Sequence, residues 1–444
     1  MRGIQTLAGL LISGLTLLFF TNVEAKSATG DRVLVLLDSL SDKDTYARFW
    51  QQLEVFKSAD DPSTSLQYFG QTLYHHIIHF APKSPRLTQH PGLNNVQLVD
   101  FVNKGGNVLV ATGIDANDNI RALASEFDID LDTETVYSHN HYDSDHDRIV
   151  TTKFIAPETI IDSQKVKAPV LYTGTALSVG RLPLSTAILA AESDAFISDN
   201  YNMRARATDD VTLVGAMQTR NSARVAFVGS LDLFSDKYFD ASVKEFDCLS
   251  FYSYHESGNK DFVEQLTKWV FQEKSVLKVE NQSHHRQNDT EQRDWYRIKD
   301  DIIYDVDIVE YRDDHWVPYT ANDVQLELIM LDPYIRTTLK QVDVKEVGRF
   351  EANIRLPDVY GVFTLKVNYK RPGLTYILAE DQISIRPFRH NEYPRYLTAA
   401  YPYYAGTGSM MVGFIIFSAI WLATWGARID KSKSKKAEHK AKVN

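Results

Sequence analysis

Cysteine is nearly absent from this 444-residue chain, which contains only Cys248. A single thiol excludes an internal disulfide, so the folded part has to be stabilised by burial of a hydrophobic core, which a chain of this length can supply. No glycine elbow surrounds Cys248, and its sequence context favours a small buried residue. A nucleophile or an intermolecular bridge is the alternative reading of this thiol.

An excess of positive charge is also missing, because the formal net charge of the chain is −10. The tail after Arg428 is basic, so the part of the chain that precedes it is still more acidic than this total. This balance argues against polyanionic ligands and excludes the basic footprint of a nucleic-acid-binding protein.

The common phosphate-binding and nucleophile motifs are absent as well. The first predicted strand ends at Leu37-Asp38-Ser39, without the glycine fingerprint of a dinucleotide site, and Gly105-Gly106 precedes a strand rather than a helix. Ser230 follows a strand but lacks the second glycine of a nucleophile elbow. We therefore predict no catalytic residue and no cofactor.

One long stretch lacks charge altogether, from Tyr396 to Ala427. Within it, Thr407–Ala427 is apolar and long enough to cross a bilayer as a helix, for which about 20 residues are needed. Tyrosines stand at one end of this segment, and Trp421 and Trp425 at the other, as in interfacial aromatic belts. The sequence predicts one transmembrane helix here.

The two ends of the chain predict its topology. Arg2 precedes an apolar run, and small residues before position 26 indicate a signal peptide that is cut after Ala25. A cleaved signal, a late span and a basic tail give a type I protein with a lumenal domain. Lys440 and Lys442 stand at −5 and −3 from the end and resemble a dilysine retrieval signal of the endoplasmic reticulum. The alternative is a basic tail held near anionic lipid.

Strand and helix patterns alternate in the first lumenal region. Short apolar runs predict strands buried on both faces at 32–39, 75–80 and 107–112, and 3.6-residue periodicity predicts helices between and after them. A helix capped by Ser41 and Asp44 is expected to follow the first strand. Short connections favour parallel pairing in a doubly wound α/β sheet, and 211–218 with 224–229 favours an antiparallel hairpin.

The period changes to two after residue 297, where apolar and polar residues alternate in short runs separated by Gly and Pro. This pattern predicts an all-β sandwich. Residues 280–293 contain no apolar side chain and predict an exposed linker with two acceptor sequons, at Asn281 and Asn288. The alternative for each sequon is an unmodified loop.

The densest group of metal-binding residue types is His139–Asp147, with three imidazoles and three carboxylates. A divalent-metal site is one reading, but the spacing fits no ligand motif, and a solvated acidic loop is the other. We assign no metal ligand.

The predicted organisation of the whole chain is: signal peptide 1–25, α/β domain 26–279, polar linker 280–296, β-sandwich 297–390, stalk 391–406, transmembrane helix 407–427 and cytosolic basic tail 428–444.

Several stretches together resemble a known family, the forty-eight-kilodalton, Wbp-type subunit of the eukaryotic oligosaccharyltransferase complex. The stretches that carry the resemblance are 33–38, 221–225, 229–236, 356–363 and 401–405. None of them is a catalytic motif, and the likeness runs over nearly the whole mature chain.

The resemblance implies a non-catalytic subunit of the endoplasmic reticulum membrane. The complex transfers a preassembled glycan from dolichol diphosphate to Asn in N-x-S/T sequons, with the chemistry on a separate polytopic subunit. The implied partners are that catalytic subunit, ribophorin-type subunits, a small multi-span DAD-type subunit and membrane lipid, but no nucleic acid. A membrane-anchored lumenal hydrolase or sugar-binding protein remains the alternative, and a recycling cargo receptor is a third reading.

Overall fold

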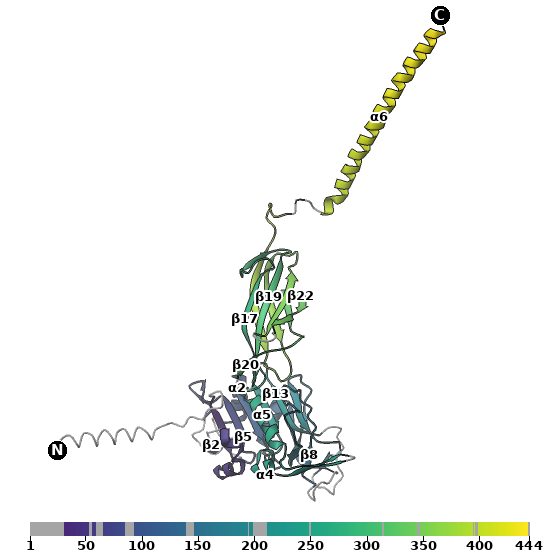
Figure 1. Cartoon of the computed structure of the whole chain (residues 1–444). Helices are drawn as coiled ribbons and strands as arrows, with labels where there is room; N and C mark the ends of the chain where they lie inside the picture. Colours follow the sequence, from purple (N-terminus) through teal and green to yellow (C-terminus); the bar gives the residue numbers. More distant parts are fainter. Residues whose placement is uncertain are drawn as a thin grey trace, which may run out of the picture.

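The computed structural model describes residues 31–52, 56–58, 65–84, 93–138, 146–193, 195–198, 211–247, 250–312, 315–343, 347–393, 395 and 398–442. Along the chain these residues form an α/β region, a β-rich region and one long helix, in that order (Figure 1). Ala25, His139–Asp145 and Cys248 lie outside the described residues, so the expectations placed on them stay predictions.

A ten-stranded mixed sheet forms the centre of the α/β region. Its order is β12-β7-β10-β13-β14-β6-β5-β1-β2, with β11 paired to β13. The bounds of these strands are β1 (Val33–Leu37), β2 (Phe56–Ser58), β5 (His76–Phe80), β6 (Asn107–Ala111), β7 (Ile129–Ser138), β10 (Thr175–Val179), β11 (Ser185–Ala190), β12 (Ala195–Ser198), β13 (Thr212–Gln218) and β14 (Arg224–Val228).

The half of the sheet from β2 to β14 is parallel, and helices cover both of its faces. Side chains alternate along a strand, so Val33 and Val35 face one hydrophobic core while Leu34 and Leu36 face another. Every residue of β1, β5 and β6 is buried. This explains why these strands are continuous apolar runs.

The remaining half of the sheet is antiparallel, because the β13–β14 hairpin reverses the chain direction. β10 and β11 then pair antiparallel with β13, and β7 with β10 and β12. The α/β character of the region is confirmed, together with the hairpin, but the doubly wound sheet is not confirmed in detail. Residues 153–156 contribute only an isolated bridge, between Phe154 and Leu189.

The helices of the α/β region are short. Their bounds are η1 (Leu40–Tyr46), η2 (Phe49–Gln52), α2 (Asn95–Asn103), α3 (Asp118–Glu126), η4 (Asp232–Phe234), α4 (Asp236–Phe239) and α5 (Asn259–Val270). The first predicted helix is two 3₁₀ segments, and its capping box uses Ser39 and Asp42 rather than Ser41 and Asp44. The short minor pairs are β3 (Gln67–Tyr68) with β4 (Gln71–Thr72), β8 (Ile149–Thr151) with β9 (Val170–Tyr172), and β15 (Val243–Asp247) with β16 (Ser250–Tyr254).

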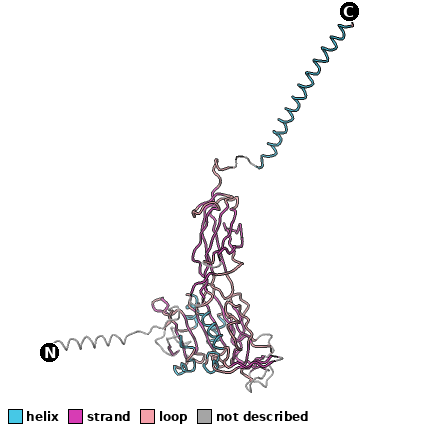
Figure 2. Tube along the Cα trace, in the orientation of Figure 1, coloured by secondary structure: helices cyan, strands magenta, loops and turns pink. Residues whose placement is uncertain are grey.

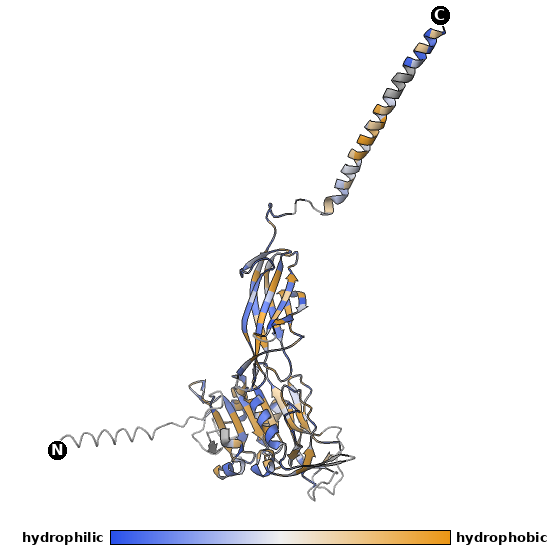
Figure 3. Cartoon of the chain, viewed as in Figure 1, coloured by the Kyte–Doolittle hydropathy of each residue, from blue (hydrophilic) through white to orange (hydrophobic). Residues whose placement is uncertain are grey.

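Two five-stranded sheets build the β-rich region, and their inner faces enclose one hydrophobic core (Figures 1 and 2). The first contains β17 (Val276–Arg286), β19 (Asp301–Arg312), β20 (His315–Pro318), β23 (Lys340–Asp343) and β24 (Arg349–Arg355). The second contains β18 (Trp295–Arg297), β21 (Gln325–Met330), β22 (Asp332–Thr338), β25 (Gly361–Tyr369) and β26 (Ile377–Arg386). Hydrophilic and hydrophobic residues alternate along these strands (Figure 3), as the period of two predicts.

The first half of the predicted linker is a strand. Residues 280–286 continue β17, which pairs with β19 along its length. The strand lacks apolar residues here because it lies at the edge of its sheet, where polar side chains meet solvent. Its buried position is filled by His284, whose Nδ1 lies 2.7 Å from the Tyr296 hydroxyl and whose Nε2 lies 3.2 Å from Asp381.

A single long helix, α6 (Tyr401–Ala441), follows the short η5 (Thr398–Ala400). Within the described residues it is the one helix long and apolar enough to cross a membrane, over Thr398–Trp425. The helix continues without a break into the hydrophilic tail (Figure 3).

We expect acid to destabilise the α/β region through His79 in the centre of β5. This side chain is buried, and burial lowers the pKa of His79 from its ordinary 6.5 to about 4. Only the unfolded chain then takes up a proton between these values, so the free energy of unfolding falls as pH decreases from 6.5 towards 4, by up to roughly 3 kcal/mol.

The change His79→Leu should flatten that part of the stability–pH curve, measured by urea unfolding of the full chain in detergent. The exposed His390→Asn is the control and should leave the slope unchanged. An unaltered slope in His79→Leu would contradict this assignment.

Candidate functional site

The two folded regions meet where the turn between β25 and β26 packs against the α/β region. Main-chain atoms of the turn bind α/β side chains directly: Gln218 Nε2 donates to the Leu374 carbonyl at 2.6 Å, and Trp269 Nε1 to the Gly373 carbonyl at 2.8 Å. The Tyr376 amide donates in return to Ser222 Oγ at 3.1 Å. These bonds couple the sandwich to the sheet and to α5.

Arg224 lies at the centre of this junction and is fully buried at the start of β14. One terminal nitrogen donates to the carbonyls of Trp269 and Lys274 at 2.6 and 2.8 Å, and the other to those of Ser275 and Gly373 at 2.7 and 3.2 Å. The guanidinium carbon lies 4.9 Å from the centre of the Trp269 ring. One side chain thus ties together the end of α5, the start of the sandwich and the β25–β26 turn.

The charge of Arg224 is balanced by dipoles rather than by a carboxylate among these contacts. The Trp269 carbonyl belongs to the last turn of α5, where the helix dipole presents partial negative charge. Burial nevertheless lowers the pKa of Arg224 to about 9, and Nε has no hydrogen-bond partner. The guanidinium therefore stays charged at neutral pH and depends on its four carbonyls.

Gly373 makes this close approach possible. Its φ is +80°, in the left-handed region, and an added Cβ would lie 2.3 Å from Thr159 Oγ1. Any larger residue would both strain the turn and push it away from the α/β region.

A polar cavity of about 730 Å³ lies beside the junction. Its walls come from both regions and include Lys268, Lys274 and Arg312 together with several carboxylates. The charges pair among themselves, as between Lys268 and Glu264 at 2.6 Å. Burial lowers the pKa of Lys274 to about 8, but its ammonium already donates to the Ile160 carbonyl and Gln265 Oε1. The charged residues that line this cavity therefore pair with one another, and none of the contacts described for them places a nucleophile beside a base.

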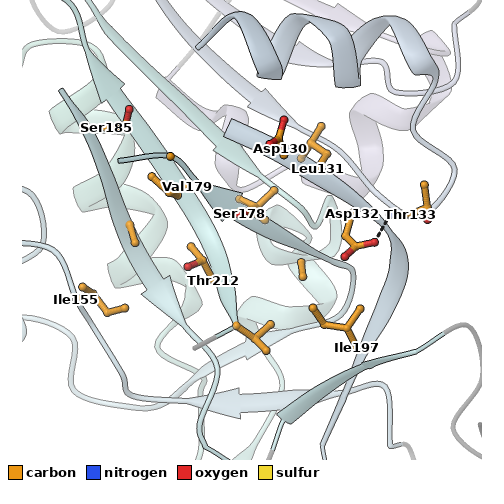
Figure 4. A pocket seen from close by; sticks show the side chains of 15 residues that line it. Asp130, Leu131, Asp132, Thr133, Ile155, Ser178, Val179, Ser185, Ile197 and Thr212 are labelled. Atoms are coloured by element: carbon orange, nitrogen blue, oxygen red, sulfur yellow. Dashed lines mark hydrogen bonds between the residues drawn. The ribbon is translucent and has the colours of Figure 1, made fainter. Parts of the chain in front are cut away.

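A second cavity of about 730 Å³ opens in the antiparallel half of the sheet, where β10 and β13 pair at a single position (Figure 4). Its lining mixes apolar and polar side chains, with Asp130 and Asp132 on β7. Asp130 accepts from Ser125 Oγ at 2.9 Å, and Asp132 from the Thr133 amide at 2.7 Å. These local bonds account for the two carboxylates.

Ser230, which the structure describes, is not part of a catalytic site. Ser230 is fully buried, and its hydroxyl donates to the Thr173 carbonyl at 2.6 Å and accepts from the Leu233 amide. It therefore closes a turn. Among the described residues, no three His, Cys, Asp or Glu side chains are grouped to hold a metal ion.

The sequons and the tail lie on the surface. Asn281 is exposed on β17, Asn288 is exposed in the turn after it, and Lys440 and Lys442 are exposed at the end of α6. This exposure is compatible with the modification and recognition predicted for them, which stay predictions.

Sequence reasoning missed Arg224 as the residue of the junction. The available signal was a cation directly before the apolar run Val225–Val228 and after a turn. The same pattern indicates an arginine at an exposed strand end equally well. Arg224 is buried only because the folded sandwich packs against it.

Taken together, the described residues define a two-domain protein with one candidate membrane helix and with polar groups that hold the domains together. Comparison with protein families matches the chain to two models, "OST48, N-terminal domain" over residues 24–273 and "OST48 middle domain" over residues 284–425. The chain belongs to the OST48 family.

Relatives from a plant and from animals agree with this assignment. The chain is 37% identical to a protein of Arabidopsis thaliana over 414 residues (89% of this chain and 93% of the relative) and 36% identical to one of Drosophila melanogaster over 435 residues (92% and 94%). A Danio rerio protein is 37% identical over 418 residues (89% and 93%). Each is named "dolichyl-diphosphooligosaccharide–protein glycosyltransferase 48 kDa subunit".

We expect Arg224→Met to destabilise the chain by at least about 3 kcal/mol, because four buried carbonyls lose a charged donor. Arg224→Lys should recover part of this loss, since one ammonium cannot reach the whole set. Denaturant unfolding measures the effect.

Arg220→Met, in the exposed β13–β14 turn, is the matched control and should change the free energy of unfolding by less than about 0.5 kcal/mol. Equal effects at positions 220 and 224 would show that Arg224 does not carry the junction.

Proposed function

We propose that this protein is the 48 kDa subunit of an oligosaccharyltransferase, and that it supports the assembly and stability of that complex without performing the transfer. The observation that carries the proposal is the match of both folded regions and the apolar helix to one family, with relatives that bear this name. The reaction proposed for the complex is transfer of a preassembled glycan from dolichol diphosphate to Asn of N-x-S/T sequons.

The side chains of the two cavities favour a supporting role. Lys274 donates to neighbours, and Asp130 and Asp132 accept from adjacent groups. Ser230, the serine nearest to an elbow position, is buried in a turn. A general base or nucleophile needs a free, oriented atom at a site where substrate can bind. We therefore assign the chemistry to a different, polytopic subunit.

The proposed topology is type I in the endoplasmic reticulum membrane. Residues 407–427 of α6 would cross the bilayer, the two folded regions would lie in the lumen, and the basic end of the helix would lie in the cytosol. Cleavage after Ala25, glycans at Asn281 and Asn288, and retrieval through Lys440 and Lys442 belong to the same proposal. The proposed partners are the catalytic subunit, ribophorin-type subunits and the small DAD-type subunit.

Replacing Thr407–Ala427 by a Leu/Ala span should reduce co-purification of the other subunits while the folded regions keep their thermal stability. The physical reason is that Gly406, Gly408 and Gly413 leave open space along α6, where a neighbouring helix can approach closely. Quantitative pull-down of the full chain from membranes measures the change, and the native span is the control.

Unchanged recovery of partners after the replacement would show that the span is only an anchor. Glycan transfer to a sequon peptide by the purified chain alone would contradict the non-catalytic role.

Removing the two terminal lysines together, by Lys440→Ala with Lys442→Ala, should shift the chain out of the endoplasmic reticulum, measured by fractionation of membranes. The matched control is Lys433→Ala with Lys435→Ala, two exposed lysines that lie earlier in the same tail. It removes the same charge but leaves the −5 and −3 positions intact. Retention of both double variants would contradict the retrieval signal, and loss of both would favour lipid electrostatics.

A further inference from the structure

A short stretch of chain joins the end of the sandwich, where β26 finishes, to the start of α6. After β26 the chain folds back: both terminal nitrogens of Arg386 bind the Glu392 carboxylate at 2.7 and 2.8 Å, and the rings of Phe388 and Tyr393 pack with centres 5.5 Å apart. Only the stretch from Tyr393 to Ala400 then remains as a tether, and it reaches at most about 25 Å when fully extended.

A row of apolar side chains crosses the outer face of the second sheet at this same end. Ser384 on β26 pairs with Trp295 on β18 and with Val362 on β25. Ile329 on β21 pairs with Thr364 on β25, and Leu331 follows two residues later at the tip of the β21–β22 hairpin, at the same end of the sheet as Val362. We call Trp295, Val362 and Leu331 the apolar row.

The members of the apolar row are unusually exposed. Trp295 is 42%, Val362 59% and Leu331 99% exposed, and Tyr360 beside the row is 68% exposed. Leu331 forms the tip of the β21–β22 hairpin with φ +64°, a conformation that is costly for a leucine. Elsewhere this face carries charge pairs, such as Lys366 with Glu380 at 2.7 Å and Arg336 with Glu327 at 2.6 Å. The exposed apolar groups are therefore concentrated at one end.

We propose that the apolar row lies in the interfacial layer of the bilayer beside α6, with Leu331 as its deepest member. The row runs across the strands rather than along them, so Trp295 and Val362 share one height above a membrane that the strands meet end-on, and Leu331, beyond the end of β21, reaches furthest towards it. Trp and Tyr are the side chains that favour this layer. The guanidinium carbons of Arg386 and Arg286 lie 4.8 and 5.8 Å from the Trp295 ring centre and fix the ring from the sandwich side, while each cation pairs with a carboxylate, Glu392 or Asp300.

The proposal rests on the proposed membrane span, because the tether brings the row to a bilayer only if α6 crosses one. Two features favour contact with lipid over contact with a partner protein. The exposed apolar side chains lie at one end of the sheet, and the most exposed of them, Leu331, stands on a narrow hairpin tip. A protein partner would instead bury a broad face of the sheet, and that face is charged over most of its length.

Single-cysteine labelling tests the row directly, because Cys248→Ser removes the only native cysteine of the chain. In that background, a solvatochromic maleimide is attached at Leu331→Cys, Leu378→Cys or Ile415→Cys, and the full chain is reconstituted into phosphatidylcholine vesicles. Leu378 is the matched control: an exposed leucine on the same strand face, about 20 Å from Ser384 along β26. Ile415 lies within α6 and reports on the span.

We expect the probe at 331 to show a blue-shifted emission and quenching by lipids that are spin-labelled near the headgroup, while the probe at 378 shows neither. Quenching at 415 by lipids that are spin-labelled on the acyl chain, without headgroup quenching at 331, would overturn the apolar row and leave the span intact. Absence of quenching at all three positions would overturn the span and the row together.

A purified multi-subunit complex separates lipid from protein contact. If the probe at 331 is unquenched by lipid in vesicles but is shielded from a water-soluble quencher in the complex, a partner subunit covers the row and the lipid proposal is wrong.

The variant Leu331→Asn should keep the unfolding temperature of the full chain, because asparagine tolerates the left-handed conformation. It should also abolish quenching, by the same headgroup-labelled lipids, of a probe attached at Val362→Cys in the Cys248→Ser background if the row acts as one unit, and unchanged quenching at 362 would contradict this.

Discussion

The buried guanidinium of Arg224 is the interaction on which the arrangement of this protein depends. It joins the end of α5, the first residues of the sandwich and the β25–β26 turn through four main-chain carbonyls. Because carbonyls have fixed directions and the cation has no other compensation among these contacts, the two folded regions are positioned as well as connected. Gly373 completes the junction by allowing the turn to approach Thr159.

A junction of this kind suits a protein whose role is to hold others in place. The α/β region and the sandwich each have their own hydrophobic cores, and the contacts between them are specific hydrogen bonds rather than a broad apolar interface. Only a short stretch of chain separates the end of the sandwich from η5 and α6, so the two folded regions are connected to the candidate membrane helix through a short tether. These features together favour a scaffold at the membrane surface.

Much of the fold could be predicted from periodicity, but only where one element buries a regular face. β1, β5 and β6 are continuous apolar runs, and β24 and β25 alternate strictly, so local pattern predicts both kinds. Residues 280–286 of β17 have the pattern of a linker because His284 replaces an apolar residue and depends on Tyr296 and Asp381 for its burial. Strands such as β7, which pairs with β10 and β12, carry mixed patterns whose partners are distant in sequence.

The sequence by itself determined the apolar span, the acidic balance, the lack of disulfides and the resemblance to a subunit family, because these depend on composition and local pattern. Tertiary structure alone decided that the sheet is half antiparallel, that Arg224 is buried, and that Trp295, Val362 and Leu331 share one row. The physical reason is that strand register and burial are set by pairing between residues far apart in the chain. A local pattern shows which side chains are apolar, but only packing shows which of them stay in contact with solvent.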